Sequence, residues 1–397
     1  MPRRASGPAA VFFFFALSIF WTGCGTSHQV CPLASNSTCS CGAPSSACPA
    51  DFIPLLYATT SSNQILGFSI NSSGALTALP SATGPTHSES VATDGNALEL
   101  ADTSTNSVDG FTVDLVTGAV MAIQGSPFSL GTPGGGPTYI LVGPYGYLYA
   151  TEPNGTIVGL TTNSELGTFS SPLPNSPYPA GVAPSQMAFA AQGDSGTFFL
   201  YASDPGDSVG GILAYSLDSS GSLIPIQDSP FATLPNANPS FILVAPYYPS
   251  QGTQGTQFLL VSLTDAAKVA VFAIDSSTGE LAQVPGSPFA VGNGPNALLA
   301  DVSNHVFVMN ASDHTVSAFN LGSNGVLTAI GPPVPVGTAS GGIALYGSSS
   351  ADELFVADTA ASAIWTLNVD PTTGALSPSG QPLAVSSPPL QLVLVEP

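Results

Sequence analysis

The chain has 397 residues, of which only three are Lys or Arg and 24 are Asp or Glu, giving a formal net charge of −21 at pH 7. So negative a chain repels phosphate backbones, which excludes nucleic-acid binding and disfavours anionic membrane surfaces and phosphorylated substrates. Hydrophobic residues make up 44% of the chain and charged residues only 7%, which excludes an intrinsically disordered protein. The 42 Gly and 37 Pro residues indicate many short strands joined by turns rather than helices.

Residues 1–23 have the features of a secretory signal peptide. Arg3 and Arg4 form a basic start, an apolar run follows, and small residues precede Cys24. The apolar run is too short for a comfortable transmembrane helix. Small residues before a cysteine resemble the bacterial lipobox, whose cysteine is lipidated, although Trp21 stands where that motif prefers an aliphatic residue. We therefore expect an exported protein, held at the cell envelope by a lipid on Cys24 on the periplasmic or outer-membrane face. The alternative is ordinary secretion with a free Cys24.

Residues 24–52 are rich in Ser, Ala, Pro and Gly and are interpreted as a tether that holds the next domain away from the membrane. The other cysteines of the chain all lie in this segment: Cys31, Cys39, Cys41 and Cys48. An even number of cysteines in an oxidising compartment predicts two disulfides, and three pairings are open. A metal site is the alternative, but the spacing matches no familiar zinc motif.

From residue 53 onward the chain consists of copies of one unit. An aromatic residue or Leu recurs in a segment of alternating apolar and polar residues, at Phe68, Phe111, Leu160, Tyr215, Phe272, Phe319 and Leu367. A period of about 50 residues with four short strands per copy is typical of propeller blades. The sequence therefore predicts an all-β fold over residues 53–397, a seven-bladed β-propeller of four-stranded antiparallel blades.

Each copy carries strand and turn signals. The first strand follows a Pro-x motif in six copies, whereas one copy has Gly341-Gly342-Ile343 instead. An Asp-x-x-Thr-Gly motif predicts a tight turn before the outer strand, because Asp bonds nearby backbone amides and Gly adopts the left-handed conformation. The aspartates of this motif are therefore predicted to be structural: Asp114, Asp275 and Asp370. The Phe of a Ser-Pro-Phe motif is predicted to pack between blades: Phe128, Phe231 and Phe289.

The two ends of the repeat region complement each other. The region begins at residue 53 with a strand of the second type and ends with an unpaired strand of the first type at 390–394. Pairing these two strands would complete the seventh blade from both ends of the chain and would hide the sheet edges. Deletion of residues 388–397 is therefore expected to destabilise the whole ring.

The motif order Phe-x-Ile-Asp, Thr-Gly-x-Leu, Gly-Ser-Pro-Phe and Gly-x-x-Pro, clearest at residues 272–295, resembles the seven-bladed propeller lactonases. That family includes 6-phosphogluconolactonase-like and carboxymuconate-cyclase-like proteins and related propellers with Tyr-Val-Thr-Asn repeats. The resemblance implies a Gly-Pro-Arg-His motif at a first strand, a Glu after the next strand and further Arg residues around the pocket. Here Gly84-Pro85-Thr86-His87 keeps the His but has Thr for Arg, and Glu152 matches the Glu. No Arg follows Arg4, so a clamp for carboxylate or phosphate substrates is missing, and a neutral lactone is the substrate that remains.

Carboxylates recur in the connections between second and third strands, at Asp102, Glu152, Asp204 with Asp207, Asp265, Asp313 and Asp358. Because these connections lie on one face of a propeller, an acidic rim is expected there. Such a rim can bind a cation, Ca²⁺ included, or supply a general base, or the aspartates can simply favour turns. His87 heads a first strand near the channel mouth and is the candidate for proton transfer, with a loop histidine bonded to the backbone as the alternative.

Two functions from different classes follow from these patterns. The first is a cell-envelope lipoprotein that binds a small-molecule ligand or a protein partner on one propeller face, without catalysis. The second is a lactonase-like hydrolase that opens a neutral lactone ring, with His87 and Glu152 as catalytic residues. In either case we expect a monomer that binds no nucleic acid, with Ca²⁺ as the one candidate cofactor.

Overall fold

The computed structural model describes residues 53–395, apart from 86–87, 89, 94, 132–134, 164–167, 192–197, 209, 249–254 and 348–351. The predicted signal peptide, the tether and all five cysteines therefore lie outside the described residues. Over the ranges that are described, no helix is both long and apolar enough to cross a bilayer. The regular structure there is almost entirely β, with one short 3-10 helix, η2 (Thr264–Ala266).

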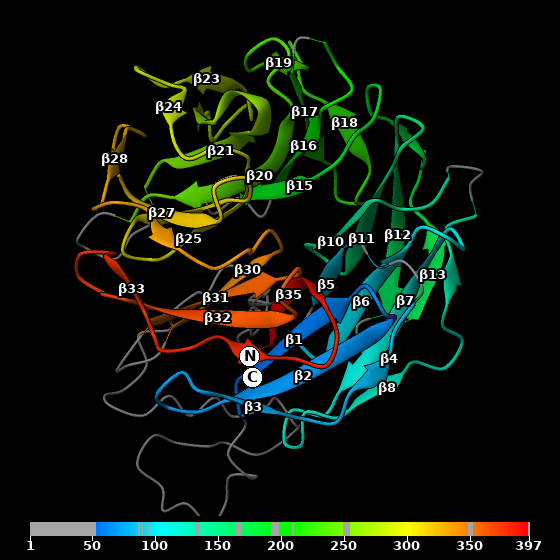
Figure 1. Ribbon diagram of the computed structural model, residues 1–397. Coiled ribbons are helices and arrows are strands. Elements are labelled where there is room, and N and C mark those ends of the chain that lie inside the picture. The colour runs from blue at the N-terminus through cyan, green and yellow to red at the C-terminus, as the bar shows by residue number, and fades with distance from the viewer. Residues whose placement is uncertain are drawn as a thin grey trace, which may run out of the picture.

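Seven antiparallel sheets are arranged as blades around a central axis (Figure 1). In chain order, blade 1 consists of β35 with β1–β4, and blades 2 to 7 consist of β5–β9, β10–β14, β15–β19, β20–β24, β25–β29 and β30–β34. Every blade runs outward from an innermost strand through a second and a third strand to a short fourth strand. This arrangement confirms the predicted seven-bladed propeller.

The strands fall into five classes by their place in a blade. The innermost strands are β35 (Pro389–Val395), β5 (Val91–Thr93), β10 (Tyr139–Gly143), β15 (Met187–Ala191), β20 (Pro239–Pro246), β25 (Pro295–Ala300) and β30 (Ile343–Gly347). The second strands are β1 (Leu55–Thr60), β6 (Ala97–Asp102), β11 (Tyr147–Glu152), β16 (Phe198–Asp204), β21 (Gln257–Leu263), β26 (His305–Asn310) and β31 (Asp352–Asp358). The third strands are β2 (Gln64–Ile70), β7 (Ser107–Val113), β12 (Thr156–Asn163), β17 (Gly211–Leu217), β22 (Lys268–Ile274), β27 (Thr315–Leu321) and β32 (Ala363–Val369). The fourth strands are β3 (Leu76–Ala78), β8 (Val120–Ala122), β13 (Thr168–Pro172), β18 (Leu223–Pro225), β23 (Leu281–Gln283), β28 (Leu327–Ala329) and β33 (Leu376–Pro378).

Each blade has one feature that the sequence did not predict, a two-residue fifth strand that pairs with the third strand beyond the end of the fourth. These strands are β4 (Ala82–Thr83), β9 (Phe128–Ser129), β14 (Tyr178–Pro179), β19 (Phe231–Ala232), β24 (Phe289–Ala290), β29 (Val334–Pro335) and β34 (Leu383–Ala384). In blade 5 the hydroxyl of Ser287, just before β24, accepts a hydrogen bond of 2.8 Å from the backbone N–H of Val271. Equivalent bonds join Ser126 to Gly110, Ser176 to Gly159 and Ser229 to Ala214. The Ser-Pro motif therefore satisfies the one third-strand amide that falls between the fourth and fifth strands.

The ring closes as predicted from the two ends of the chain. β1 pairs with β35, with Leu56 opposite Leu394 and Ala58 opposite Leu392. The unusual Gly341-Gly342 copy lies at the same seam, where the N–H of Gly342 donates to the carbonyl of Leu390 at 2.8 Å. A Cβ on Gly341 would fall 2.7 Å from the backbone carbonyl oxygen of Leu390, so glycine is what lets blades 7 and 1 approach this closely.

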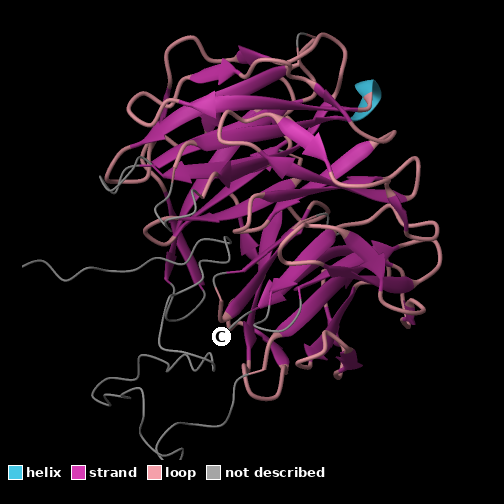
Figure 2. Cartoon of the chain, turned by 90° about the vertical axis from the view of Figure 1, so that its left-hand side faces the viewer, coloured by secondary structure: helices cyan, strands magenta, loops and turns pink. Residues whose placement is uncertain are grey.

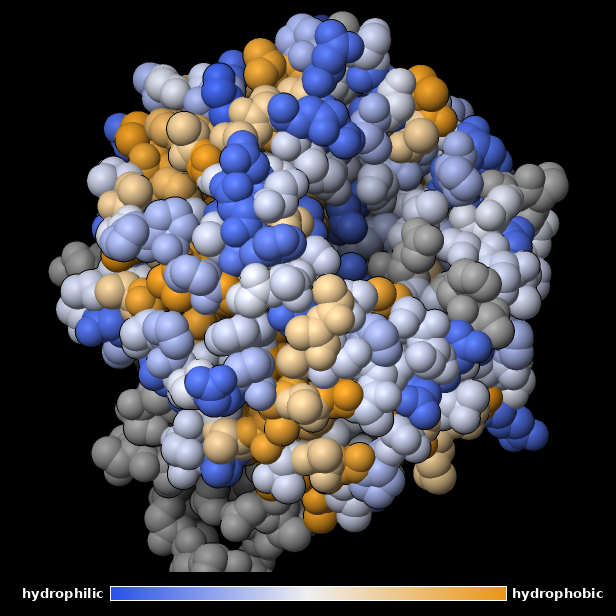
Figure 3. Space-filling model, in the orientation of Figure 1, coloured by the Kyte–Doolittle hydropathy of each residue, from blue (hydrophilic) through white to orange (hydrophobic). Residues whose placement is uncertain are grey.

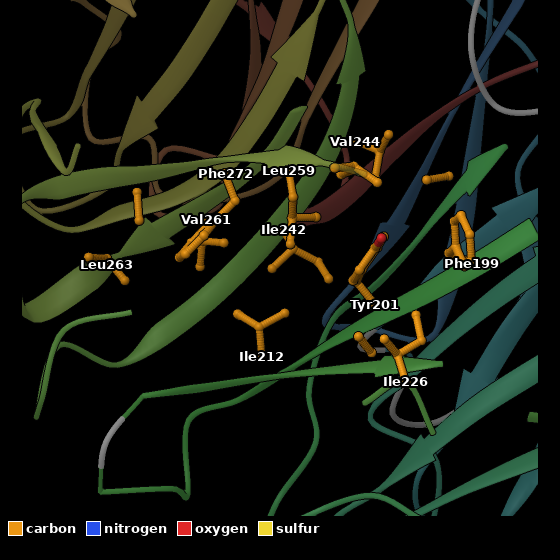
Figure 4. Close-up of a cluster of buried hydrophobic side chains, with 14 of the residues drawn as sticks. Phe199, Tyr201, Ile212, Ile226, Ile242, Val244, Leu259, Val261, Leu263 and Phe272 are labelled. Atoms are coloured by element: carbon orange, nitrogen blue, oxygen red, sulfur yellow. The ribbon is translucent and has the colours of Figure 1, made fainter. Parts of the chain in front are cut away.

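The hydrophobic core is divided among the interfaces between neighbouring blades. Figure 4 shows the cluster between blades 4 and 5, in which Tyr201 and Ile212 face Leu259 and Phe272. Burying one such side chain stabilises the fold by about 1.5–3 kcal/mol. The predicted packing of the Ser-Pro-Phe rings is confirmed, since Phe231 and Phe289 contact such clusters and the ring of Phe128 lies 5.1 Å from that of Phe169 in the next blade.

Polar contacts also join each blade to the next. The hydroxyl of Tyr201 in blade 4 donates to the carbonyl of Gly279, in the β22–β23 turn of blade 5, at 2.8 Å. Tyr57 and Tyr149 make the equivalent bonds to Gly118 and Gly221. Asp275 shapes that turn by accepting from the backbone N–H groups of Ser277 and Thr278 at 2.8 and 3.0 Å. Asp114 and Asp370 accept the same pair of backbone bonds, so the structural role predicted for the three aspartates is confirmed.

Candidate functional site

The blades present two different faces to solvent. The second-to-third connections and the starts of the innermost strands lie at one end of the ring, which we call the front face, and the third-to-fourth turns lie at the other end, the back face. η2 belongs to the front face, and Figure 2 shows it at the right-hand edge, the side that is turned to the viewer in Figure 1. Figure 3 therefore shows the front face, which is hollowed near the centre of the ring with hydrophilic residues inside the hollow.

Most of the predicted acidic rim is not exposed. Four of its carboxylates end a second strand and are at most 5% exposed: Asp102, Glu152, Asp204 and Asp358. Asp204 accepts hydrogen bonds from the backbone N–H groups of Val182 at 2.8 Å and Ala183 at 2.9 Å. The expectation of an exposed rim is wrong at these positions, because the side chains turn back to satisfy amides of the adjoining loops.

Hydrogen bonds hold two of these buried carboxylates in the ionised form. Burial would raise the pKa of Asp358, but bonds from Ala361, Thr338 and Trp365 outweigh it and leave the pKa below its ordinary value. Burial would also raise the pKa of Asp102. The hydrogen bonds that Asp102 accepts from Ser104 outweigh this effect, and its pKa is lowered. A carboxylate whose lone pairs are already occupied by donors is a poor general base.

The two predicted catalytic residues are not brought together in the described part of the chain. Glu152 is fully buried, and its Oε2 accepts from the hydroxyl of Thr156 at 2.8 Å. His87 lies outside the described residues. The motif Gly84-Pro85-Thr86-His87 does not open its innermost strand directly, because β5 begins at Val91 and the pair Val91–Leu100 corresponds to the pair Ile140–Ala150 in blade 3. Ser90 is therefore the residue of blade 2 that is equivalent to Tyr139. The Gly84-Pro85 motif lies three residues farther from Ser90 than the corresponding Gly-Pro motif lies from Tyr139.

Two other predicted carboxylates are exposed on the front face. Asp265 lies in η2, and Asp313 lies in the β26–β27 connection. Asp313 accepts from the backbone and side-chain amides of Asn293 at 2.7 and 2.9 Å. Asp207, in the connection after β16, is half-buried. Over the described ranges, no three Asp, Glu, His or Cys side chains come together as a set that could hold a metal ion.

Two further carboxylates, which the sequence did not predict as site residues, have raised pKa values. Burial and the nearby Asp102 raise the pKa of Asp109 in β7 to about 6. Burial and the adjacent Asp352 raise the pKa of Glu353 in β31 to about 7. One carboxylate oxygen of each, Oδ2 of Asp109 and Oε2 of Glu353, is buried without a hydrogen-bond partner. The position of Glu353 in its strand could have identified it from the sequence, because other second strands have an apolar residue there, such as Leu55 or Phe199.

Where the innermost strands begin, the positions that the structure describes hold uncharged residues. The strand pairings place seven equivalent residues around the channel mouth, and we call this set the mouth ring: Ser90, Tyr139, Gln186, Phe241, Ala297, Gly342 and Gln391. The residues just before them are Thr138, Ser185, Ser240, Asn296, Gly341 and Leu390 in the blades where that position is described. Lys268, at the start of β22, is the one Lys or Arg after Arg4.

No protein-family model matches the chain, and no curated protein matches it. Solved structures do match over most of its length. A structure described as a putative 6-phosphogluconolactonase from Bacteroides uniformis has a TM-score of 0.68 and 18% identity, covering 87% of this chain and 100% of its own. The chain has the fold of the propeller lactonases. The corresponding protein of Bacteroides fragilis, at 17% identity, covers 89% of this chain and 100% of its own, also at a TM-score of 0.68.

The periplasmic gluconolactonase PpgL of Pseudomonas aeruginosa matches equally well. It has a TM-score of 0.68 and 18% identity, covering 87% of this chain and 99% of its own. At these identities the similarity establishes the fold, which confirms the architecture expected from the repeated motifs.

Proposed function

We propose that the protein is an exported lipoprotein, anchored through Cys24, whose propeller binds a ligand or a partner at the front face without catalysis. The observation that carries the proposal is the burial of the front-face carboxylates that a hydrolase would need as bases. Glu152 is fully buried and bonded to Thr156, and Asp204 is bonded to the backbone of the preceding loop. What remains is a face that is hollow at its centre, with uncharged residues at the described positions of the mouth ring.

The direction of the chain supports this use of the front face. β1 begins at the back face, and β35 ends there beside it, with Leu55 opposite Val395. Both ends of the propeller therefore leave from the back face. An anchor upstream of residue 53 would then attach behind the ring, and the front face would be open to the surroundings.

A thermal-shift screen of the mature protein against a broad small-molecule library tests binding. A ligand of the native state raises Tm by mass action. We expect at least one ligand whose effect is lost in Ser240→Trp, a bulky substitution where the innermost strand of blade 5 begins, and kept in Ser276→Trp, which alters the exposed back-face turn of the same blade. No hit in the whole library, or hits that respond equally to both variants, would contradict binding at the front face.

Labelling with radioactive palmitate tests the anchor. The label should enter the full-length protein in the native host and disappear in Cys24→Ala, while Cys31→Ala keeps it. Labelling that survives Cys24→Ala would refute anchoring at this residue.

A neutral-lactone hydrolase is the second candidate, supported by the fold shared with the periplasmic gluconolactonase of Pseudomonas aeruginosa. Its test is a pH-stat assay of mature protein against a panel of neutral lactones, beside His87→Ala and Glu152→Gln. Turnover lost in both variants would favour the hydrolase over the binding protein. Turnover unaffected by either would keep the activity and reject the two residues.

A further inference from the structure

Few large hydrophobic side chains are strongly exposed over the described ranges, and most of these lie toward the back face. Val116 is in the β7–β8 turn, Tyr145 is in the β10–β11 turn, and Met121 and Ile224 lie on fourth strands just after back-face turns. They belong to blades 2, 3 and 4, which follow one another along the right-hand side of the ring (Figure 1). We call these four residues the back patch. The exception is Val182, in the front-face connection between β14 and β15.

Tyr145 is the most unusual member of the back patch. Its backbone has a φ of 64°, in the left-handed region that costs a non-glycine residue about 1–2 kcal/mol. Most other non-glycine residues with a positive φ in the described ranges are Asn or Asp. The ring of Tyr145 is 40% exposed and packs edge-on against Phe198 of blade 4 and Tyr147 of its own blade, at centroid distances of 5.5 and 6.3 Å. A costly conformation that holds an aromatic ring at the surface points to binding rather than to folding.

The back patch begins beside the point at which the chain enters the propeller. Val116 shares its turn with Gly118, and a Cβ on Gly118 would lie 3.0 Å from the side chain of Leu55, the first residue of β1. A lipid on Cys24 would therefore attach next to blade 2. Residues 24–52 can span at most about 100 Å, so the lipid alone would not fix which face of the ring points to the bilayer.

The charges near the back patch select the kind of bilayer. The back-face turns of blades 2 and 4 carry Asp114 and Asp218, and hydrogen bonds from Thr117 and Ser220, respectively, hold their pKa values below the ordinary value. Lys268, the one Lys or Arg of the described residues, begins β22 at the front face. An anionic membrane surface would therefore be repelled. A zwitterionic headgroup has no net charge, and its ammonium group is attracted to the two carboxylates.

We propose that the back patch docks the ring onto the surface of a zwitterionic lipid bilayer, with Val116 and Tyr145 entering the headgroup layer. Tyrosine suits this position because its ring is apolar and its hydroxyl is polar. The inference rests on the proposed lipid anchor and adds what the lipid cannot supply, an orientation in which the front face points away from the membrane. Weak docking suffices, because an anchored ring stays close to the bilayer.

Tryptophan reporters test the docking in the lipidated protein. Tyr145→Trp and Val182→Trp are compared in vesicles of phosphatidylethanolamine and phosphatidylcholine whose acyl chains carry bromine, a quencher of indole fluorescence. Trp365 is common to both variants, so the parent protein supplies the background. We expect the fluorescence added by Tyr145→Trp to be quenched and that added by Val182→Trp to be unchanged. Equal quenching of the two, or none in Tyr145→Trp, would overturn the proposal.

The mature chain with Cys24→Ser measures docking without the lipid. Its affinity for the same vesicles should fall about fivefold to tenfold on adding Tyr145→Ser, the effect of partly burying one side chain, and stay unchanged on adding Val182→Ser. Vesicles of phosphatidylglycerol should bind it more weakly than the zwitterionic vesicles. Equal loss in the two serine variants, or tighter binding to the anionic vesicles, would contradict docking through the back patch.

The outcomes separate this inference from the proposed function. If palmitate labelling shows no lipid on Cys24, the anchor is wrong and the vesicle affinity of the unlipidated chain decides the docking, which the absence of binding would then refute. If the lipid is present, the reporters decide, and their failure leaves the anchor and the front-face binding intact. A dimer in solution that Tyr145→Ser dissociates would show that a second copy covers the patch, and would overturn the proposal.

Discussion

Glu353 is expected to make the stability of the ring depend on pH. Its side chain is 1% exposed and lies against Gly74 in the β2–β3 turn of blade 1, across the seam where the ring closes. Asp352 beside it opposes ionisation, and Tyr346 and Asn368 are its uncharged partners on the adjacent strands. No described cation is at hand, so the ionised form of Glu353 is a buried charge without compensation.

The magnitude follows from the two pKa values. The pKa rises from an ordinary 4.5 to about 7 in the folded protein. Below about pH 4.5 the group is protonated in both states and costs nothing. Between about pH 4.5 and 7 the folded state binds a proton that the unfolded state has released, so the free energy of unfolding falls as the pH rises. The loss is complete above about pH 7 and amounts to about 3 kcal/mol.

Glu353→Gln removes this penalty while keeping the shape of the side chain. Urea unfolding at pH 4 and at pH 8 should show the variant more stable than the parent by about 3 kcal/mol at pH 8 and equal to it within about 0.5 kcal/mol at pH 4. Glu280→Gln, in the half-buried β22–β23 turn, is the control and should change neither value. A gain of the same size at both pH values, or none at pH 8, would refute the reasoning, because a packing effect does not titrate.

The remaining predictions concern how the blades are joined. Deletion of 388–397 removes β35, with the buried Leu392 and Val395, and should cost about 5 kcal/mol or more; an unchanged Tm would contradict closure through this strand. Gly279→Ala should cost about 1–3 kcal/mol more than Gly380→Ala, since both have positive φ but only a Cβ at Gly279 meets Phe199, at 2.6 Å. Equal losses of unfolding free energy in the two variants would show that blade contact plays no part there. Ser287→Ala leaves the N–H of Val271 unpaired and should lower the free energy of unfolding by about 1–2 kcal/mol in chemical denaturation. The control Ser276→Ala should lower it by less than about 0.5 kcal/mol. Equal effects of the two substitutions would argue against the role of the Ser-Pro motif.

The architecture was predictable because each element repeats. Three signals predict the same ring: the recurring aromatic at the Phe272 position, the Asp275 turn and the unpaired strand at 390–394. Where one copy departs from the pattern, the other copies still define the strand order. The two-residue fifth strands escaped prediction because strands such as Phe289–Ala290 are too short to show any periodicity.

The site was much less predictable than the fold. Sequence spacing placed Asp102, Asp204 and Asp358 correctly at strand ends, but it cannot tell whether a carboxylate at a strand end faces solvent or turns back onto loop amides. The His87 motif misled because a three-residue insertion before Val91 shifts the register without changing the local sequence pattern. Gln186 and Asn296 belong to Pro-x segments that open two innermost strands, and nothing in the sequence shows that their buried amide oxygens lack hydrogen-bond donors.

The most direct test of the account is a single calorimetric titration of the mature protein with gluconolactone, with heat-denatured protein as the blank. Binding gives heats that saturate, whereas turnover gives a continuing heat flow after each injection. The account predicts no sustained heat flow above the blank, because the carboxylates at the strand ends are buried and bonded to the protein. Sustained heat flow that disappears in Glu152→Gln would contradict it and would establish the chain as a hydrolase.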